Sequence, residues 1–322
     1  MKKKRKEESV KEIVEKIKKE VSKVVVGQEE VIHEIIRAIL CDGHVLVEGV
    51  PGTAKTLLVK AFAKVTGCEM KRIQFTVDLL PTDITGIMSY TPKKGFEVIK
   101  GPIFSNFVIA DEINRSPPKT QSALLEAMQE KAVTIARETY ELPKPFFVMA
   151  TENPLEVSGV YSLPEAQVDR FLFKLIVNYP HEKEEKKILE NNVTTKKFED
   201  YDLNGILSPK KIIALQEKTK EIFASEAIKN YIIKIVGYTR KKDEEFSKYI
   251  SCGASPRASI SLYIASKAEA MMKGRKYVIP QDVKTVVYPI LRHRIILNYE
   301  AEAEKITTDE VIKHILQKVT AP

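Results

Sequence analysis

A glycine-rich loop contains the residue types that point most directly to chemistry. The segment GVPGTAKT, which begins at Gly49, follows the short apolar run HVLVEG. Gly49 and Gly52 allow the backbone to curl so that successive N–H groups point at one anion. Lys55 adds a mobile positive charge, and the hydroxyl of Thr56 is an oxygen ligand of the kind that Mg²⁺ prefers. The loop is therefore predicted to bind nucleotide phosphates together with Mg²⁺.

One letter of this loop departs from the general pattern GxxxxGK[ST], because Ala54 stands where the last glycine is expected. The position needs little room and alanine can adopt helical dihedrals, so the loop is expected to tolerate it. The strand–loop–helix context argues against a chance glycine turn with an exposed lysine. The predicted nucleotide-binding residues of the loop are Gly49, Pro51, Gly52, Thr53, Ala54, Lys55, Thr56 and Leu57.

A pair of carboxylates ends another apolar run. The segment FVIADE places Asp111 and Glu112 at the carboxyl end of a predicted buried strand. Asp111 can hold Mg²⁺, usually through water, and Glu112 can polarise the water that attacks the γ-phosphate. Alone, such a pair more often caps a helix or is solvated. Together with the phosphate loop, it favours hydrolysis of the nucleotide over binding alone.

Three further residues are candidates for contact with the nucleotide. Asn153, in ATENP, either orients the attacking water or forms an Asn-Pro turn. Arg170, in PEAQVDRF, either meets the charge of a phosphoryl transition state or pairs with Asp169. Arg257, in GASPRAS, follows a Ser-Pro pair that suggests a helix start. Their spacing alone does not decide whether either arginine reaches the nucleotide.

The elements that must position these residues alternate between strand and helix. Short apolar runs are typical of buried parallel strands, and alternation with helices predicts an α/β layer with a parallel sheet. A helix is expected from Thr56 to about Thr66, and another at 117–130 with Ser116 as its cap and Pro117 at its first position. The predicted strands are HVLVEG (44–49), KRIQFT (71–76), FVIADE (107–112), FFVMAT (146–151) and FKLIVNY (173–179).

Two segments interrupt this alternation, and the pattern changes after Pro180. Residues 84–104 and 131–143 are predicted to form hairpins. From His181 onward the periodicity is helical, which predicts an all-α domain beginning near residue 182. Residues 8–22 are predicted to form a separate amphipathic helix.

Composition limits the class of protein. With 322 residues and 43% hydrophobic content, the chain is long enough for one large domain or two ordinary ones. There is no membrane-length apolar run and no secretory h-region, so a cytoplasmic location is expected. Five of the positive charges behind the net charge of +8 lie at residues 2–6, a short basic tail that is usually solvated. The three cysteines are far apart and have no metal-ligand spacing.

Taken together, the motifs resemble those of AAA+ ATPases, and specifically the MoxR family of the helix-2-insert clade, which is related to magnesium-chelatase motor subunits. The resemblance runs from about Val24 to the C-terminus, and Ala54 in the phosphate loop is itself usual in this family. The segments that carry it are VVGQEEVI, EGVPGTAKT, VIADEINRSPPKTQSALLEAMQE, MATENP, YSLPEAQVDRF, GASPRA and LRHRI.

This resemblance implies a fold and a division into domains. The expected fold is an α/β P-loop core, a parallel five-stranded sheet, followed by a C-terminal all-α lid, with ATP between them. Residues 1–22 would be a basic amphipathic helix, residues 23–181 the nucleotide-binding domain and residues 182–322 the lid. Residues 78–104 would be the helix-2 insert, and residues 131–142 the hairpin that precedes sensor 1.

The resemblance also implies roles for individual residues. Asn153 falls at the sensor-1 position and Arg257 at sensor 2 on the lid, where it would also bind the nucleotide. Arg170 would be the arginine finger that acts across a subunit boundary. Gly27 and Gln28 would lie near the adenine, where contacts are mostly apolar or made by the backbone.

Active members of the family form rings, generally homo-hexamers, and hydrolyse ATP with Mg²⁺ to mature or remodel other proteins in a chaperone-like way. They often work beside a separate protein with a von Willebrand factor A domain, a domain whose DxSxS signature is missing here. Two alternatives remain open. The basic excess and Lys93-Lys94 would also suit a nucleic-acid-stimulated motor or loader, and hydrolysis could serve only to reset a nucleotide-gated switch. The client protein is not identified by the sequence.

Overall fold

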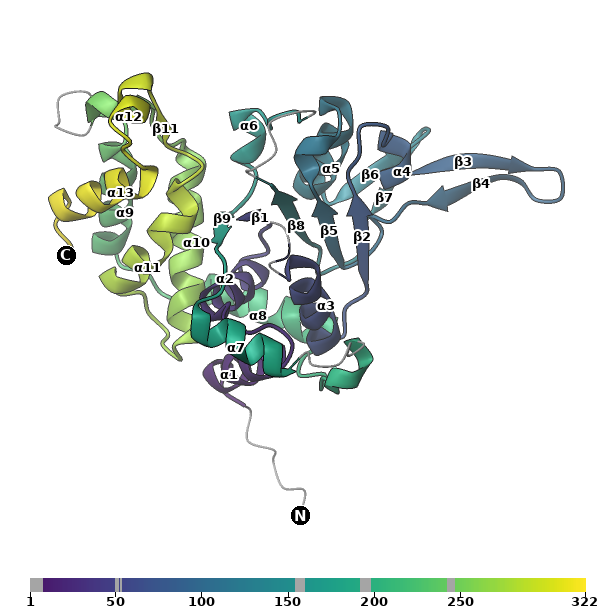
Figure 1. Ribbon diagram of the computed structural model, residues 1–322, viewed down its shortest axis with the longest axis horizontal. Coiled ribbons are helices and arrows are strands. Elements are labelled where there is room, and N and C mark those ends of the chain that lie inside the picture. The colour runs from purple at the N-terminus through teal and green to yellow at the C-terminus, as the bar shows by residue number, and fades with distance from the viewer. Residues whose placement is uncertain (1–7, 50–51, 53, 154–159, 192–197, 242–246) are drawn as a thin grey trace, which may run out of the picture. The chain divides into compact units, whose positions relative to one another are not determined.

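The computed structural model describes residues 8–49, 52, 54–153, 160–191, 198–241 and 247–322 (Figure 1). The chain divides into two compact units, which are described separately. One comprises Val21–Ala214, and the other combines Met1–Glu20 with Leu215–Pro322. In the described part of the chain, no helix is both long and apolar enough to span a bilayer.

The first unit is built on a five-stranded sheet in the order β2-β5-β8-β1-β9, in which all neighbours are parallel. This confirms the predicted five-stranded parallel core. Each strand begins and ends within a residue or two of the corresponding apolar run. The strands are β1 (Val45–Gly49), β2 (Met70–Gln74), β5 (Phe107–Asp111), β8 (Phe147–Glu152) and β9 (Phe173–Val177).

Helices cover both faces of this sheet. On one face, alternate strand residues such as Val108 and Val148 share a core cluster with Leu124 and Met128 of one helix, α5. The opposite-facing residues, such as Ile109, are equally buried, and α3 contacts β2 and β5 there. The helices of the unit are α2 (Glu29–Leu40), α3 (Lys55–Thr66), α4 (Pro81–Thr85), α5 (Pro118–Glu130), α6 (Glu165–Val168) and α7 (Glu182–Asn191), with 3₁₀ turns η1 (Ile113–Arg115) and η2 (Phe198–Tyr201).

The start of α5 differs by one residue from the prediction. Pro117 is the capping residue and Pro118 takes the first helical position, where a missing N–H costs nothing. Ser116 does not cap the helix, because its hydroxyl donates instead to the carbonyl of Ile113 in η1, at 3.4 Å. The two prolines in succession allow either register, and the 3₁₀ turn decides between them.

The two predicted hairpins are present as antiparallel pairs outside the main sheet. The first consists of β3 (Gly86–Thr91) and β4 (Gly95–Lys100), and it projects beyond the sheet (Figure 1). The second consists of β6 (Ala132–Ile135) and β7 (Glu138–Glu141) and directly follows α5.

The second unit is helical, with one short antiparallel strand pair that the sequence pattern did not predict. The N-terminal helix α1 groups with this unit although it precedes the α/β unit in the sequence. Its apolar stripe, Ile13, Val14 and Ile17, is buried. The elements are α1 (Val10–Val21), α8 (Pro209–Glu221, which bridges the boundary), α9 (Glu226–Tyr238), η3 (Ser247–Tyr249), β10 (Ile250–Cys252), α10 (Pro256–Met272), α11 (Pro280–Leu291), β11 (Ile296–Leu297), α12 (Tyr299–Ala303) and α13 (Thr308–Lys318).

Candidate active site

The carboxyl end of the sheet brings together the glycine-rich loop and the acidic pair. Gly49 ends β1 so close to β9 that an added Cβ would lie 2.8 Å from the carbonyl oxygen of Val177, which explains the glycine. Gly52 has a φ of +83°, a conformation that other residues rarely adopt. The predicted binding residues Pro51 and Thr53 lie outside the described residues.

Ala54 has an unexpected backbone conformation. It precedes α3 with φ 57° and ψ 22°, in the left-handed region. The expectation that alanine fits here through ordinary helical dihedrals is therefore wrong. The left-handed conformation brings Cβ close to the following carbonyl and costs about 1–2 kcal/mol. The loop keeps a conformation suited to glycine even though the residue is alanine.

Lys55 opens α3 and already has a backbone partner. Its Nζ donates to the carbonyl oxygen of Gly49 at 2.7 Å. Partial burial lowers the pKa of Lys55, and the nearby carboxylates of Asp111 and Glu112 oppose that effect. The charges of these three predicted residues are therefore close enough to influence one another. Thr56 lies in the first turn of the same helix.

Asp111 ends β5 and is held from two sides. Its Oδ1 accepts a hydrogen bond from the hydroxyl of Thr151 on β8 at 2.6 Å. Its Oδ2 accepts from Nη2 and Nε of Arg72 on β2, at 2.6 and 3.1 Å. The side chain of Asp111 is only 14% exposed, whereas that of Arg72 is 47% exposed. The arginine can therefore move into solvent and release the carboxylate.

Glu112 is fixed by its backbone and by its carboxylate. Its φ is 57°, in the left-handed region, and its N–H donates to Oγ1 of Thr151 at 2.9 Å. Its Oε2 accepts from Nε2 of Gln74 at 2.8 Å and pairs with Nε of Arg115 at 3.2 Å. A strained backbone that neighbouring groups hold in place is typical of functional positions.

Sequence reasoning missed four of these partners: Arg72, Gln74, Arg115 and Thr151. The parallel register explains three of them. It sets Gln74 of β2 opposite Asp111, with Arg72 two residues earlier on the same face of the strand, and it places Thr151 one residue beyond the last position of β8 that pairs with β5. Polar residues at the ends of neighbouring parallel strands could have been grouped from the sequence. Arg115 lies three residues after Glu112, which is also a readable spacing.

The remaining predicted residues lie in different environments. Asn153 follows β8 and is buried. Nη1 of Arg170, between α6 and β9, donates to the carbonyl of Leu125 in α5 at 3.0 Å. Arg257 lies in the first turn of α10, in the helical unit, where Ser255 caps the helix and Pro256 begins it, as the sequence predicts.

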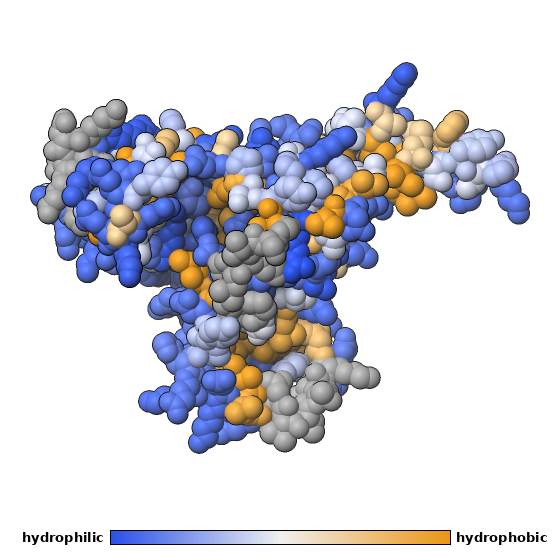
Figure 2. Space-filling model, turned by 45° about the horizontal axis from the view of Figure 1, so that its top comes forward, coloured by the Kyte–Doolittle hydropathy of each residue, from blue (hydrophilic) through white to orange (hydrophobic). Residues whose placement is uncertain are grey.

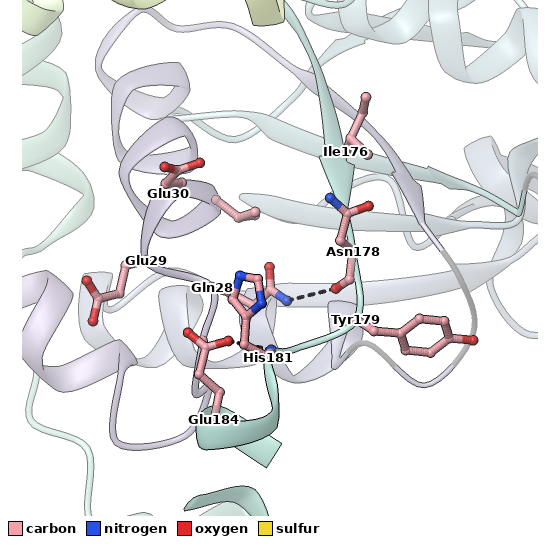
Figure 3. A pocket seen from close by; sticks show the side chains of 10 residues that line it. Gln28, Glu29, Glu30, Ile176, Asn178, Tyr179, His181 and Glu184 are labelled. Atoms are coloured by element: carbon pink, nitrogen blue, oxygen red, sulfur yellow. Dashed lines mark hydrogen bonds between the residues drawn. The ribbon is translucent and has the colours of Figure 1, made fainter. Parts of the chain in front are cut away.

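Two pockets adjoin the segment at Gly27 and Gln28. The acidic pocket, of about 410 Å³, is lined by the carboxylates of Glu29, Glu30 and Glu184 and by Gly27 and His181 (Figure 3). Within it the amide of Gln28 donates to the backbone carbonyl of Asn178 at 3.3 Å. Its three carboxylates make it unsuitable for phosphate.

The apolar pocket, of about 120 Å³, adjoins the glycine-rich loop. It is smaller than the roughly 300–1,000 Å³ of a complete ligand pocket, so it suits one planar part of a ligand. Gln28 lines both pockets, while Gly27 lines the acidic one. The residues that line the apolar pocket are Lys23, Val24, Val25, Val26, Gln28, Gly52, Ala54, Leu57, Pro180, Ile188 and Tyr201.

Known proteins share this arrangement along nearly the whole chain. Residues 44–173 match the family described as "ATPase family associated with various cellular activities (AAA)", and residues 243–315 match the AAA lid domain. The chain is 46% identical to Chaperone MoxR1 of Mycobacterium tuberculosis over 308 residues, which is 94% of this chain and 81% of the relative. This chain is a MoxR-family AAA+ ATPase.

Two further similarities support membership of the MoxR family. Protein MoxR of Paracoccus denitrificans is 31% identical over 87% of this chain and 88% of its own length. A crystal structure from Cytophaga hutchinsonii superposes with a TM-score of 0.90 at 47% identity, covering 97% of this chain and 96% of that one. The AAA core with its helical lid is thus shared along almost the full length, and the MoxR-family chain is an ATP hydrolase.

Proposed function

We propose that this MoxR-family ATPase uses Mg²⁺-dependent ATP hydrolysis to remodel partner proteins, as a ring of six identical subunits in the cytoplasm. A separate protein with a von Willebrand factor A domain is the proposed co-worker, on the strength of the family resemblance alone. The single observation that carries the remodelling role is the exposed apolar hairpin β3–β4 on the same unit as the candidate ATPase site.

The site residues divide the hydrolytic work between binding and proton transfer. Lys55 would hold the β- and γ-phosphates at the N-terminus of α3, where unpaired N–H groups favour anions. Glu112 would accept the proton of the attacking water, once the amide of Gln74 releases its carboxylate. Asn153 would orient that water. Arg257 from the lid and Arg170 from a neighbouring subunit would meet the transition-state charge.

Thr56 and Asp111 fit a magnesium ion by their chemistry. Both supply oxygen, and Mg²⁺ is usually bound by one or two protein groups together with water and substrate phosphates. Among the described residues no cluster of three or more His, Cys, Asp or Glu side chains is placed to hold a metal ion. When bound, Mg²⁺ neutralises charge on the phosphate oxygens.

The base of the nucleotide would occupy the apolar pocket. Val24, Val26 and Leu57 supply apolar surface there, and Gly52 and Ala54 of the phosphate loop line the same pocket. The acidic pocket on the other side of Gln28 would repel the phosphates and so leaves one orientation for the nucleotide.

The β3–β4 hairpin presents large apolar side chains to solvent on both of its faces, and Figure 2 shows apolar residues along the side that is turned to the viewer. Phe96 is 73% exposed and packs against Tyr90, 62% exposed, with ring centroids 5.1 Å apart. Ile87 and Ile99 form an exposed cross-strand pair on the other face. Exposed apolar surface of this kind usually marks a protein-interaction site. The proposed occupant is an unfolded segment of a client protein.

The base of the β3–β4 hairpin contacts the β6–β7 hairpin of the same unit. Nζ of Lys100, at the end of β4, lies 4.9 Å from the ring centroid of Phe104 and 5.6 Å from that of Tyr140 on β7. These cation–π contacts join the two hairpins at their bases. Movements of the unit would therefore reach the exposed hairpin.

The proposed function is tested with the double substitution Tyr90→Ser and Phe96→Ser. Reduced, carboxymethylated α-lactalbumin is a suitable unfolded probe, and its stimulation of ATP hydrolysis is measured. We expect the double variant to keep basal hydrolysis and lose the stimulation. Ile233→Ser, which removes a 60% exposed side chain from α9, is the control. Equal stimulation of all forms contradicts the proposal, and stimulation by DNA that falls steeply with salt would favour the nucleic-acid motor.

A further inference from the structure

The fully buried side-chain amide of Gln121 connects three segments close to Glu112. Gln121 lies in α5 and is 0% exposed. Its Nε2 faces the carbonyl oxygens of Ile113 at 3.2 Å, Ser116 at 3.1 Å and Tyr161 at 3.0 Å. The first two belong to the turn that directly follows Glu112 (residues 113–116), here called the hydrolytic turn. The third belongs to the segment that leads into α6.

The side chain at this position needs to be a hydrogen-bond donor. Three carbonyl oxygens converge on one nitrogen, whose two N–H groups are shared among them, and each carbonyl would lose a partner if the amide were removed. The Oε1 atom of Gln121 is buried and has no hydrogen-bond partner among the described atoms. The assignment of nitrogen and oxygen follows from this network, since a flipped amide would set oxygen against three carbonyls.

Two more contacts tie the same helix to the segment that ends at Arg170. Nε2 of Gln167 in α6 donates to Oγ of Ser122 at 3.2 Å. Nη1 of Arg170 donates to the carbonyl of Leu125 at 3.0 Å. Gln121, Ser122 and Leu125 thus form one stretch of α5 that touches the hydrolytic turn at one end and the arginine at the other.

We propose that Gln121 is a positioning residue that couples the hydrolytic turn of a subunit to the arginine finger that the same subunit presents to its neighbour. This inference rests on the proposed function, in which Arg170 acts across a subunit boundary. When nucleotide moves Glu112 and the turn after it, the shared amide moves the Tyr161 segment, α6 and Arg170 with it. Nucleotide binding in one subunit thereby sets the position of the finger that this subunit presents to the site next to it.

Mixed assemblies test this coupling. Subunits carrying Glu112→Gln cannot hydrolyse ATP but still provide Arg170, whereas subunits carrying Arg170→Ala keep Glu112 and lack the finger. Mixing them is expected to restore hydrolysis. A donor with both Glu112→Gln and Gln121→Met should restore about tenfold less, because small misplacements of a transition-state group lower rates by about tenfold or more. A donor with Glu112→Gln and Gln129→Met, an exposed position on the same helix, is the matched control and should restore fully.

Each outcome of the mixing experiment decides a different point. Full restoration by the Gln121→Met donor overturns the coupling role, because the donor's own site is already inactive and only its finger is measured. No restoration by the Glu112→Gln donor itself contradicts the action of Arg170 in trans, and the coupling role falls with it.

Circular dichroism and the thermal unfolding midpoint show whether the Gln121→Met donor folds. A second donor variant tests the same connection with a milder change. Ser122→Ala in the Glu112→Gln donor removes only the contact with Gln167 at the partly exposed face of α5. It is expected to lower restoration about threefold, in line with the loss of one hydrogen bond. Unchanged restoration with this donor overturns the inference as well.

Discussion

The two ends of the central sheet both contain ionisable groups, but they use them differently. At the carboxyl end, Asp111 and Glu112 are held by partners on neighbouring strands, and some of those partners are half exposed. At the amino end, His44 precedes β1 and is 5% exposed. Its Nδ1 accepts from the N–H of Val148 at 3.1 Å, and its Nε2 donates to the carbonyl of Met128 at 3.2 Å.

The difference lies in whether the partners can be exchanged. His44 makes both of its bonds to backbone groups of packed elements, so the ring acts as a fixed link between β1, β8 and α5. Burial lowers the pKa of His44 to about 4, and the ring is neutral at pH 7. A shifted pKa alone therefore does not mark an active site. At the carboxyl end, the half-exposed side chains of Arg72 and Arg115 can move into solvent and release the carboxylates of Asp111 and Glu112.

The largest expected effect on phosphate binding comes from Lys55, and it should lower activity without unfolding the protein. Lys55→Met removes the charge meant for the phosphates and should lower turnover by about 10²–10³-fold and weaken ATP binding. The free energy of unfolding should change by less than about 1 kcal/mol, because burial already disfavours this charge. ATP titration, steady-state hydrolysis and urea denaturation measure these quantities. Lys60→Met, exposed on the same helix, is the control, and a Lys55→Met protein with normal turnover would reverse the assignment.

The amino end should show the opposite behaviour. Since the folded-state pKa of His44 is about 4 and the ordinary value is 6.5, the unfolded chain binds the proton more readily. The contribution of neutral His44 to the free energy of unfolding is complete above pH 6.5 and is lost as the pH falls towards 4. The total loss is about 3 kcal/mol, at 1.36 kcal/mol per unit of pKa difference. Urea denaturation at pH 7.0, 5.5 and 4.5 measures it.

The substitution His44→Phe isolates this effect from that of the carboxyl groups. It should lower stability at pH 7 by about 2–3 kcal/mol, because Val148 N–H and the Met128 carbonyl lose their partner. It should also make the free energy of unfolding less dependent on pH between 7.0 and 4.5. Turnover per folded molecule should stay unchanged. His33→Phe on α2 serves as the control. If the free energy of unfolding changed equally with pH in the wild type and in His44→Phe, a group other than His44 would be responsible for the change.

An intermediate effect is expected at Thr151, which links the two carboxyl-end residues. Its hydroxyl donates to Asp111 and accepts the N–H of Glu112. Thr151→Val keeps the shape of the side chain but leaves the partly buried N–H of Glu112 unpaired. It should lower turnover about tenfold, with a loss of stability of about 1–3 kcal/mol. Thr134→Val, on the exposed face of β6, should change neither quantity. Unchanged turnover in Thr151→Val would exclude the hydroxyl from the positioning of Glu112.

The smallest effect is expected from Ala54→Gly in the glycine-rich loop. Ala54→Gly removes left-handed strain but adds freedom to the unfolded chain, and the two contributions oppose each other. ATP affinity and turnover should stay within about twofold. Ala54→Val should weaken binding strongly, because a β-branched residue fits that conformation poorly. Equal affinities for the Gly and Val variants would show that the left-handed conformation is not needed for binding.

Much of the α/β unit was predictable because the sequence patterns that specify it are local. The five apolar runs, the glycines of the loop and the acidic pair each lie within a few consecutive residues, and they predicted the sheet and the residues Lys55, Asp111 and Glu112. Arg72, Gln74 and Thr151 were missed because their roles depend on strand register between distant segments. The left-handed Ala54 was missed because loop closure, and not side-chain size, fixes its dihedrals.

The most direct test of the central claim compares binding with turnover in Glu112→Gln. ATP binding is measured by titration, and hydrolysis by a single-turnover experiment, with Glu126→Gln on the exposed side of α5 as the control. The predicted result is ATP affinity close to that of the wild type, with hydrolysis lowered by about 10²–10⁴-fold, the usual contribution of a general base. Wild-type hydrolysis by the Glu112→Gln protein would contradict the assignment of Glu112 as the base.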